Sequence, residues 1–114
     1  MRFPFKKVDR ILKRSEYIDL AENGRAVRSS LFVAVAAPSC GERSRLGLTV
    51  SRKIGSAVER NRIKRIAREH FRLNRQALRR PLDINLIARK AISGQPNNVI
   101  LRELQKLFQE LSGM

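Results

Sequence analysis

The residues best suited to chemistry in this sequence are the cations between Arg60 and Arg75. At about 100° per residue around a helix axis, most of them fall on one side. That side holds Asn61, Lys64, Arg65, Arg68, Arg72 and Arg75, with Arg60 and Arg62 at its two seams. Glu69 is the only acid in the run. Because like charges three or four residues apart repel each other, this side is expected to bind a polyanion that neutralises them.

The same run carries the signals of a single amphipathic helix. Ser56 and Glu59 match the Ser-x-x-Glu capping box, which satisfies free amide groups at a helix N-terminus. Apolar residues then recur with helical spacing, at Ile63, Ile66, Ala67, His70 and Phe71. The sequence therefore predicts a helix with one side in the core and its cationic side in solvent.

The composition is that of one small, strongly basic globular domain over residues 1–114. Its 25 Lys and Arg against 10 Asp and Glu give a formal net charge of +15. That charge points first to nucleic acid and second to an anionic membrane surface. No stretch has the apolar length of a membrane span, and the single cysteine, Cys40, excludes an intramolecular disulfide. We expect a reducing, cytoplasmic compartment and no membrane partner.

Residues 1–14 form a basic N-terminal segment with Pro4 between two phenylalanines. A frayed, solvated terminus and an arm that binds nucleic acid are both compatible with this composition.

Hydrophobic patterning predicts a two-layer α+β domain with the order α-β-β-α-β-α. The predicted elements are a helix at 15–23 capped by Ser15, strands at 30–37, 46–50 and 83–90, the helix after Ser56, and a helix at 98–112. Residues 25–28 could add a short strand. Because a short loop joins the first two longer strands, we expect them to pair as a hairpin. The helices would cover one face of the sheet and leave the other partly open.

The sequence contains no recognisable set of catalytic groups that would let the protein itself act as the catalyst. His70 is the only histidine, no His or Cys cluster could bind a transition metal, and the acids are scattered without a pair suited to two-metal hydrolysis. Tyr17 is the best candidate for stacking on an unpaired base, because on a short helix beside the sheet its hydroxyl stays in water. Core packing is the alternative for Tyr17 and the preferred interpretation for Phe71.

The segment 46–72 resembles the protein subunit of bacterial ribonuclease P. That family carries Arg-Asn-Arg, then Ile-Lys-Arg and Arg-Glu, which here are residues 60–65 and 68–69, after a strand and the basic pair Arg52-Lys53. The likeness spans nearly the whole chain and is looser at the termini and in 38–44. It implies that a large RNA with bound Mg²⁺ is the catalyst, and that this chain binds the RNA and precursor tRNA. It also implies a left-handed β-α-β crossover, whereas the general rule predicts a right-handed one.

The resemblance assigns two sets of RNA contacts. The catalytic RNA would be bound by Arg52, Lys53, Arg60, Asn61, Arg62, Lys64, Arg65, Arg68 and Arg72. The single-stranded 5′ leader of precursor tRNA would lie in a cleft between the first helix and the sheet, at Tyr17, Phe32, Val50, Arg89 and Lys90. Ala21 and Val35 stand where the family can carry further aromatics, so this cleft would have fewer stacking platforms. The Mg²⁺ would be bound mainly by the RNA.

Two other hypotheses stay open on composition. A ribosomal or chromosome-coating protein would carry a similar charge. A protein nuclease would also bind nucleic acid, but the missing acid–base groups argue against it.

Overall fold

The main elements follow the order α-β-β-β-α-β-α in the computed structural model, which describes residues 9–11, 13–39 and 41–114. They are α1 (Arg14–Asn23), β1 (Arg25–Arg28), β2 (Phe32–Pro38), β3 (Arg45–Thr49), α2 (Ala57–Asn74), β4 (Leu82–Ala88) and α3 (Asn97–Leu111), with the short 3-10 helices η2 (Arg52–Ile54), η3 (Arg75–Ala77) and η4 (Lys90–Ile92). The predicted α+β class is confirmed, with β1 as the additional short strand. Most of the predicted basic arm, 1–8 and 12, lies outside the described residues.

The four strands form one sheet in the order β1-β2-β4-β3. β1 pairs antiparallel with β2, β2 pairs antiparallel with β4, and β3 pairs parallel with β4. The predicted hairpin of β2 with β3 is therefore wrong, because β4 lies between them. The loop from β2 to β3 crosses the width of one intervening strand, about 10 Å between the outer strand axes.

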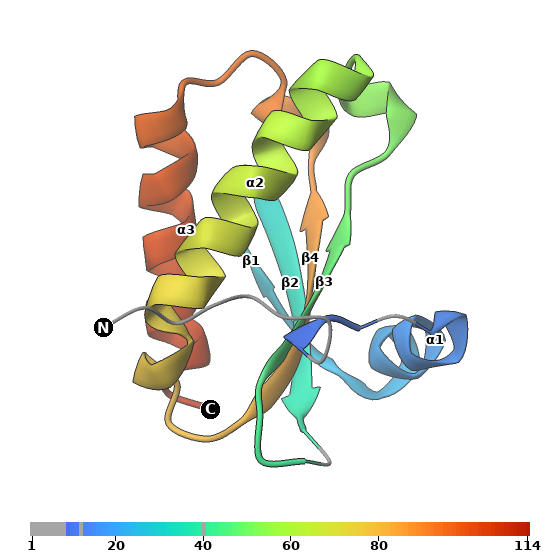
Figure 1. The fold of residues 1–114 in the computed structure, drawn as a ribbon, viewed down its shortest axis with the longest axis vertical. Helices are drawn as coiled ribbons and strands as arrows, with labels where there is room; N and C mark the ends of the chain where they lie inside the picture. Colours follow the sequence, from blue (N-terminus) through green and yellow to red (C-terminus); the bar gives the residue numbers. More distant parts are fainter. Residues whose placement is uncertain (1–8, 12, 40) are drawn as a thin grey trace.

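The connection from β3 through α2 to β4 is left-handed, as the resemblance implies (Figure 1). In that view α2 lies in front of the sheet, β3 and β4 both run upward, and β4 lies to the left of β3. A right-handed crossover would place β4 on the right.

One face of the sheet packs against α2 and α3. Alternate residues of the central strands point to this face and are at most 1% exposed: Phe32, Ala34, Ala36, Ile84 and Leu86. The helices contribute Ile63, Ala67, Phe71, Ile100, Leu104, Leu107 and Leu111 to the same core. Burial of each large aliphatic or aromatic side chain contributes about 1.5–3 kcal/mol to folding, so this core fixes α2 on the sheet.

Helix α1 packs on the opposite face, so the prediction that the helices share one face is wrong for α1. Its Tyr17 ring lies on Gly47, where an added Cβ would be 2.6 Å from Tyr17 Cε1. Gly47 alternates with the core residue Leu46 along β3 and therefore points away from α2. The Tyr17 hydroxyl donates a hydrogen bond to the Ile11 carbonyl at 3.0 Å. The absence of a side chain at Gly47 thus provides the space for the Tyr17 ring.

Arg45 joins α1 to the sheet by ion pairs. Its Nη2 lies 2.7 Å from Glu16 Oε2 on α1 and 2.7 Å from Asp83 Oδ2 on β4. The hydrogen bonds from Arg45, first to Asp83 and then to Glu16, raise the pKa of the guanidinium, and the bond from Arg45 lowers the pKa of Glu16. Arg45 therefore sets the position of α1 and, with it, of Tyr17.

The two predicted helix starts have different outcomes. Ser56 is the N-cap of α2, and its hydroxyl accepts a hydrogen bond from the Glu59 N–H at 3.2 Å. Ser15 is not a cap, because α1 begins at Arg14 and the Glu16 carboxylate accepts from the Lys13 N–H at 3.3 Å.

His70 makes the stability of the fold dependent on pH. It is 5% exposed, its ring meets Phe108 edge-on at a centroid distance of 4.7 Å, and its Nδ1 has no hydrogen-bond partner among the described residues. Burial lowers the pKa of His70 below its ordinary value of 6.5. The unfolded chain then binds more protons than the folded one at acidic pH, so stability falls as pH drops through 6.5, by at most about 1.4 kcal/mol per pH unit.

Urea unfolding of the native chain and His70→Phe between pH 8 and pH 5 measures this effect. The stability of the native chain relative to His70→Phe should decline as pH falls. A constant difference across that range would show that His70 has the same pKa in both states.

Candidate nucleic-acid interface

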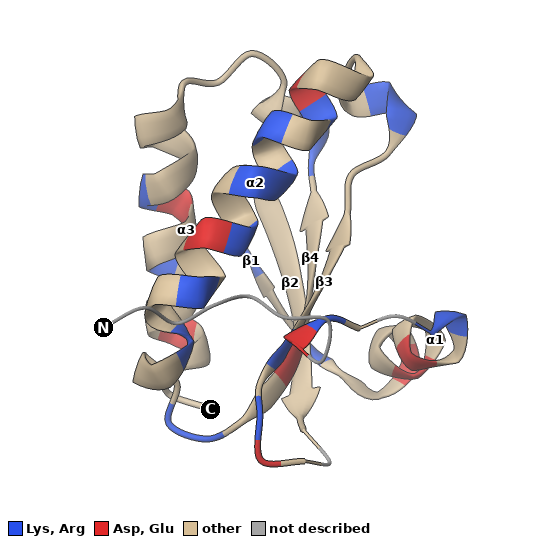
Figure 2. Cartoon of the chain, viewed as in Figure 1, with Lys and Arg blue, Asp and Glu red and all other residues tan. Residues whose placement is uncertain are grey.

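The outward side of α2 presents cations to solvent along most of its length (Figure 2). Asn61, Arg65, Arg68 and Arg72 line a shallow groove of about 530 Å³ together with Val58 and Glu69. The side chains of Lys64, Arg65 and Arg68 make no hydrogen bond or ion pair with any other described residue. Their charges are therefore available to a partner.

Among the described residues that line this groove, Glu69 is the one acid, and it pairs with Arg72. A second contact joins Arg72 Nε to Glu69 Oε2 at 3.3 Å. The hydrogen bond from Arg72 lowers the pKa of Glu69 and raises that of Arg72. Arg72 is thus partly neutralised, although its side chain still borders the groove.

Arg62 uses all three of its side-chain nitrogens for hydrogen bonds within the protein. Its Nε donates to Glu59 Oε1 at 2.6 Å, Nη1 to Asn97 Oδ1 at 2.5 Å, and Nη2 to the Gln95 carbonyl at 2.8 Å. These bonds join the start of α2 to the loop that precedes α3. The hydrogen bond from Arg62 also lowers the pKa of Glu59. The structure therefore favours a bracing role for Arg62.

Arg62→Gln should lower the free energy of unfolding by roughly 1–2 kcal/mol, because it removes charge-assisted hydrogen bonds at a site that is only 25% exposed. The corresponding drop in Tm is roughly 3–8 °C. Arg65→Gln is the matched control and should leave Tm unchanged while weakening RNA binding. Equal Tm values for both variants would contradict the bracing role.

A second group of cations lies at the end of the domain where α2 begins. Arg52 and Lys53 are exposed on η2. Lys90 at the start of η4 donates from Nζ to the Lys53 carbonyl at 2.5 Å, and Arg89 donates from Nη1 to the Ser29 carbonyl at 2.9 Å. The basic residues that follow β3 and β4 are thus brought to one end of the sheet, as expected for neighbouring parallel strands.

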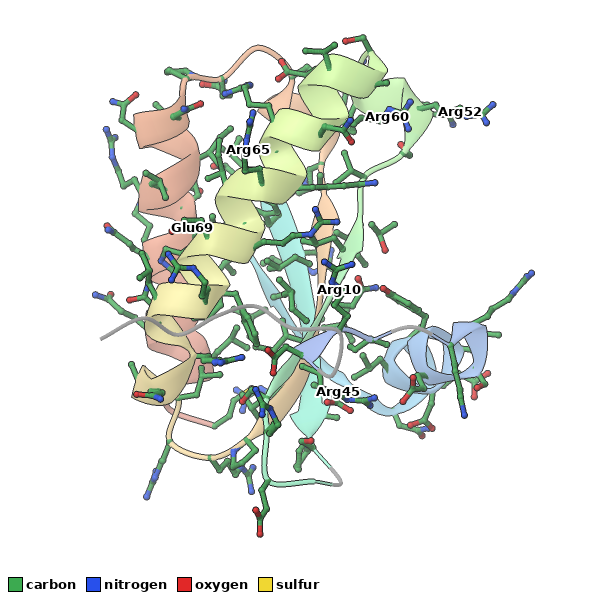
Figure 3. The ribbon with its side chains drawn as sticks, in the orientation of Figure 1. Arg10, Arg45, Arg52, Arg60, Arg65 and Glu69 are labelled. Carbon is green, nitrogen blue, oxygen red and sulfur yellow. The ribbon has the colours of Figure 1, made fainter. Side chains whose placement is uncertain are left out.

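Arg60 and Arg52 share this end of the molecule, while Arg65 and Glu69 follow further along α2 (Figure 3). Arg60 Nε is buried and has no hydrogen-bond partner among the described residues. Some of the cations predicted for the catalytic RNA therefore lie at the same end of the domain as Arg89 and Lys90, which were predicted for the leader.

The sheet face that carries α1 offers an apolar surface next to Tyr17. Val33 and Ile87 pair across β2 and β4 on this face and are half-buried. Thr49 pairs with Ile87 from β3, and its hydroxyl donates to Asn85 Oδ1 at 3.1 Å. These residues were not predicted from the sequence. They could have been found because they alternate with the core positions along each strand.

The structure contradicts the assignment of Phe32 and Val50 to a cleft on that face. Phe32 is 1% exposed and Val50 9%, and both belong to the core under α2 and α3. Phe32 pairs with Ala88, one residue out of phase with the Val33–Ile87 pair, so its side chain points to the other face. Tyr17 and Phe32 therefore lie on opposite sides of the sheet.

The two positions that lack aromatics have different environments. Ala21 is exposed on α1. Val35 is half-buried at the C-terminal end of that helix, where its Cγ1 would be 2.7 Å from a Cβ added at Gly24. Of Tyr17, Ala21 and Val35, only Tyr17 places an aromatic ring beside the open part of this face.

Most of the described carboxylates form ion pairs with cationic side chains of the protein. The pairs are Asp9 with Arg43 and Arg75, Glu16 and Asp83 with Arg45, Glu59 with Arg62, Glu69 with Arg72, and Glu103 with Lys106. Within the described ranges no group of three or more His, Cys, Asp or Glu could hold a metal ion. No helix in that part of the chain is both long and apolar enough to cross a membrane.

Comparison with known proteins agrees with this geometry. The family model described as Ribonuclease P matches residues 5–112. The chain is 49% identical over 111 residues to the ribonuclease P protein component of Desulfosudis oleivorans, covering 96% of this chain and 91% of that protein. It is 46% identical over 110 residues to the one of Desulfatibacillum aliphaticivorans, covering 96% and 93%.

Solved structures share the fold. The ribonuclease P protein of Staphylococcus aureus superposes with a TM-score of 0.86 at 30% identity, covering 91% of this chain and 95% of that one. The protein from Thermotoga maritima superposes with a TM-score of 0.81 at 30% identity, covering 89% and 96%. The chain belongs to the ribonuclease P protein family, whose members are the protein component, an accessory subunit, of the endoribonuclease that processes tRNA.

Proposed function

We propose that this chain binds the catalytic RNA of ribonuclease P and the 5′ leader of precursor tRNA, and so promotes Mg²⁺-dependent endonucleolytic removal of the leader. The observation that carries the proposal is the outward side of α2, where Lys64, Arg65 and Arg68 have no counter-charge among the described residues. Such a surface weakens the fold through repulsion unless a polyanion covers it.

The catalytic RNA is the partner assigned to this surface. Asn61, Lys64, Arg65 and Arg68 would bind its backbone along α2, and Arg52, Lys53 and Arg60 would extend the contact to the end of the sheet. Each neutralised phosphate releases counterions, so the affinity should fall steeply with salt. A bound cationic protein also reduces repulsion between the two RNAs, and the precursor then binds at lower Mg²⁺.

The leader is assigned to the open part of the α1 face of the sheet. Tyr17 supplies a ring for base stacking, Val33 and Ile87 an apolar floor, and Thr49 a polar group. Arg89 and Lys90 stand at the end of β4 and would bind leader phosphates. This proposal replaces Phe32 and Val50 with residues of the correct sheet face.

Mg²⁺ does not fit a site on the protein part described above. Hard divalent cations need several oxygen ligands, and the carboxylates of Asp9, Asp83, Glu59, Glu69 and Glu103 each have a cationic partner. The proposal therefore assigns the catalytic Mg²⁺ to the RNA.

The proposed function also implies that the protein works in the cytoplasm, where precursor tRNA is made.

Reconstitution tests the proposal. The purified protein, the RNA subunit and a 5′-labelled precursor tRNA are combined over a Mg²⁺ titration. The protein alone should cleave nothing, the RNA alone should need high salt and high Mg²⁺, and the mixture should release the leader at modest Mg²⁺.

Two outcomes would support other hypotheses. Cleavage by RNA-free protein would indicate a protein nuclease. No stimulation of the RNA, together with recovery of bulk DNA or ribosomal RNA on the purified protein, would indicate a general coating protein.

A further inference from the structure

A pocket lined by arginines lies at the opposite end of α2 from η2. It has a volume of about 440 Å³, and Arg43, Arg75, Arg79 and Arg80 line it together with Glu42 and Ser44. Four arginines thus line one hollow, and Glu42 is the only acid among the described residues that line it. Of these residues only Arg75 belonged to the predicted cationic side of the helix, and none was in the set assigned to the catalytic RNA.

The buried carboxylate of Asp9 holds two of the arginines in place. Asp9 is 0% exposed, with Oδ1 2.7 Å from Arg43 Nη2 and Oδ2 2.9 Å from Arg75 Nη1. These ion pairs join the loop before β3 to η3, the two segments that form opposite sides of the pocket. Two of the four arginines are therefore already held in place when an anion binds.

Further hydrogen bonds fix the same walls. The buried Ser44 hydroxyl accepts from the Leu82 N–H at 2.9 Å, and the Ser39 N–H donates to the Pro81 carbonyl at 3.0 Å. Ser39 Oγ also donates to the Arg43 carbonyl at 2.9 Å. The loop before β3 is thus bonded to the start of β4, next to Arg79 and Arg80.

Arg79 and Arg80 carry charges that none of these contacts neutralises. Both are exposed, and neither makes a hydrogen bond or ion pair with another residue of the described ranges. Adjacent cations beside Arg43 and Arg75 repel one another without a folding benefit. Guanidinium groups match the geometry of phosphate oxygens, which they can bind in pairs.

The pocket continues the cationic side of α2. Arg72 borders the α2 groove, and Arg75 lines the pocket one helical turn later. Figure 2 shows cations on α2 and again on the loop that leads from it to β4. From Arg65 to Arg75 the rise along a helix is about 15 Å, so one RNA strand can reach from the groove to the pocket.

We infer that this arginine pocket is a second phosphate-binding site, which holds the backbone of the RNA subunit beyond the stretch bound by α2. The inference rests on the proposed function, because it assigns the same RNA partner. Precursor tRNA is a separate source of RNA phosphate, and its leader is assigned to the α1 face of the sheet.

The test is the double variant Arg79→Gln/Arg80→Gln, with Arg25→Gln/Arg102→Gln as the matched control. The control residues are exposed on β1 and α3 and make no contact with a charged partner in the described part of the chain. Binding of the RNA subunit is measured by filter binding between 50 and 200 mM salt. The pocket variant should lose about 10- to 20-fold in affinity near 150 mM, and the slope of log K against log salt should become shallower by about 1.5.

The outcomes separate the inference from the proposed function. Equal affinities and slopes for the pocket and control variants, with steep binding by the native chain, would overturn the pocket and leave the function standing. A flat salt response of the native chain would overturn the function itself. If the preassembled pocket variant instead loses affinity only for precursor tRNA, the assignment to the RNA subunit is overturned.

Discussion

Replacing Lys64, Arg65 and Arg68 together with glutamine should weaken binding of the RNA subunit about 100-fold at 150 mM salt. Each lost phosphate contact removes about 0.7–0.9 from the slope of log K against log salt, which is about 4- to 5-fold in affinity at that salt. These three side chains make no intramolecular hydrogen bond or ion pair within the described residues. The fold should therefore survive the change, and Tm should stay constant or rise.

The control for this triple variant removes the same charge elsewhere. Arg25, Arg28 and Arg102 are exposed on β1 and α3, away from the α2 groove. Their replacement with glutamine should change affinity only by the small effect of net charge. If both triple variants bind equally weakly, long-range attraction rather than contact along α2 explains the binding.

Tyr17→Ala should weaken binding of leader-bearing precursor tRNA to the assembled complex by about 5- to 100-fold. Stacking of a base on an aromatic ring is worth about 1–3 kcal/mol. The ring is held in position by the space at Gly47 and by the hydroxyl bond to the Ile11 carbonyl. Mature tRNA has no leader, so its affinity should not change.

Tyr17→Phe separates the ring from the hydroxyl. It keeps the stacking surface and removes only the hydrogen bond of 3.0 Å to Ile11, so most of the leader-dependent affinity should remain. Equal losses for precursor and mature tRNA on Tyr17→Ala would mean that Tyr17 has a structural role alone.

The α2 helix could be predicted because its signals are local. The Ser56 cap and the apolar spacing of Ile63, Ala67 and Phe71 lie within a few turns of one another. The cationic side followed from the same periodicity. Contacts within one helix depend on neighbouring residues, so they could be predicted from the sequence pattern.

The strand order could not be predicted in the same way. Leu46 pairs with Ile84, and between them the chain forms the whole of α2. Apolar alternation defines the two faces of a strand and leaves its neighbours undetermined. The general preference for right-handed crossovers also pointed away from the observed connection; the family resemblance supplied it.

The face of Phe32 was missed because both faces of β2 are apolar. Phe32 and Ala34 point to the core, while Val33 and Val35 point towards the α1 side. Hydrophobicity alone cannot say which set lies under α2. The hydrogen bonds of Arg62 were not predicted for a related reason, since its partners Gln95 and Asn97 lie far along the chain.

The position of the catalytic RNA on α2 can be measured directly by tethered hydroxyl-radical cleavage. Glu69→Cys places an iron chelate in the α2 groove without removing Lys64, Arg65 or Arg68. Glu22→Cys places it on an exposed site of α1, across the sheet. Both are made in a Cys40→Ser background, because Cys40 is the only cysteine. The complex with the RNA subunit should be cut at a few discrete nucleotides from Glu69→Cys and not from Glu22→Cys, whereas discrete cuts from Glu22→Cys alone would contradict binding along α2.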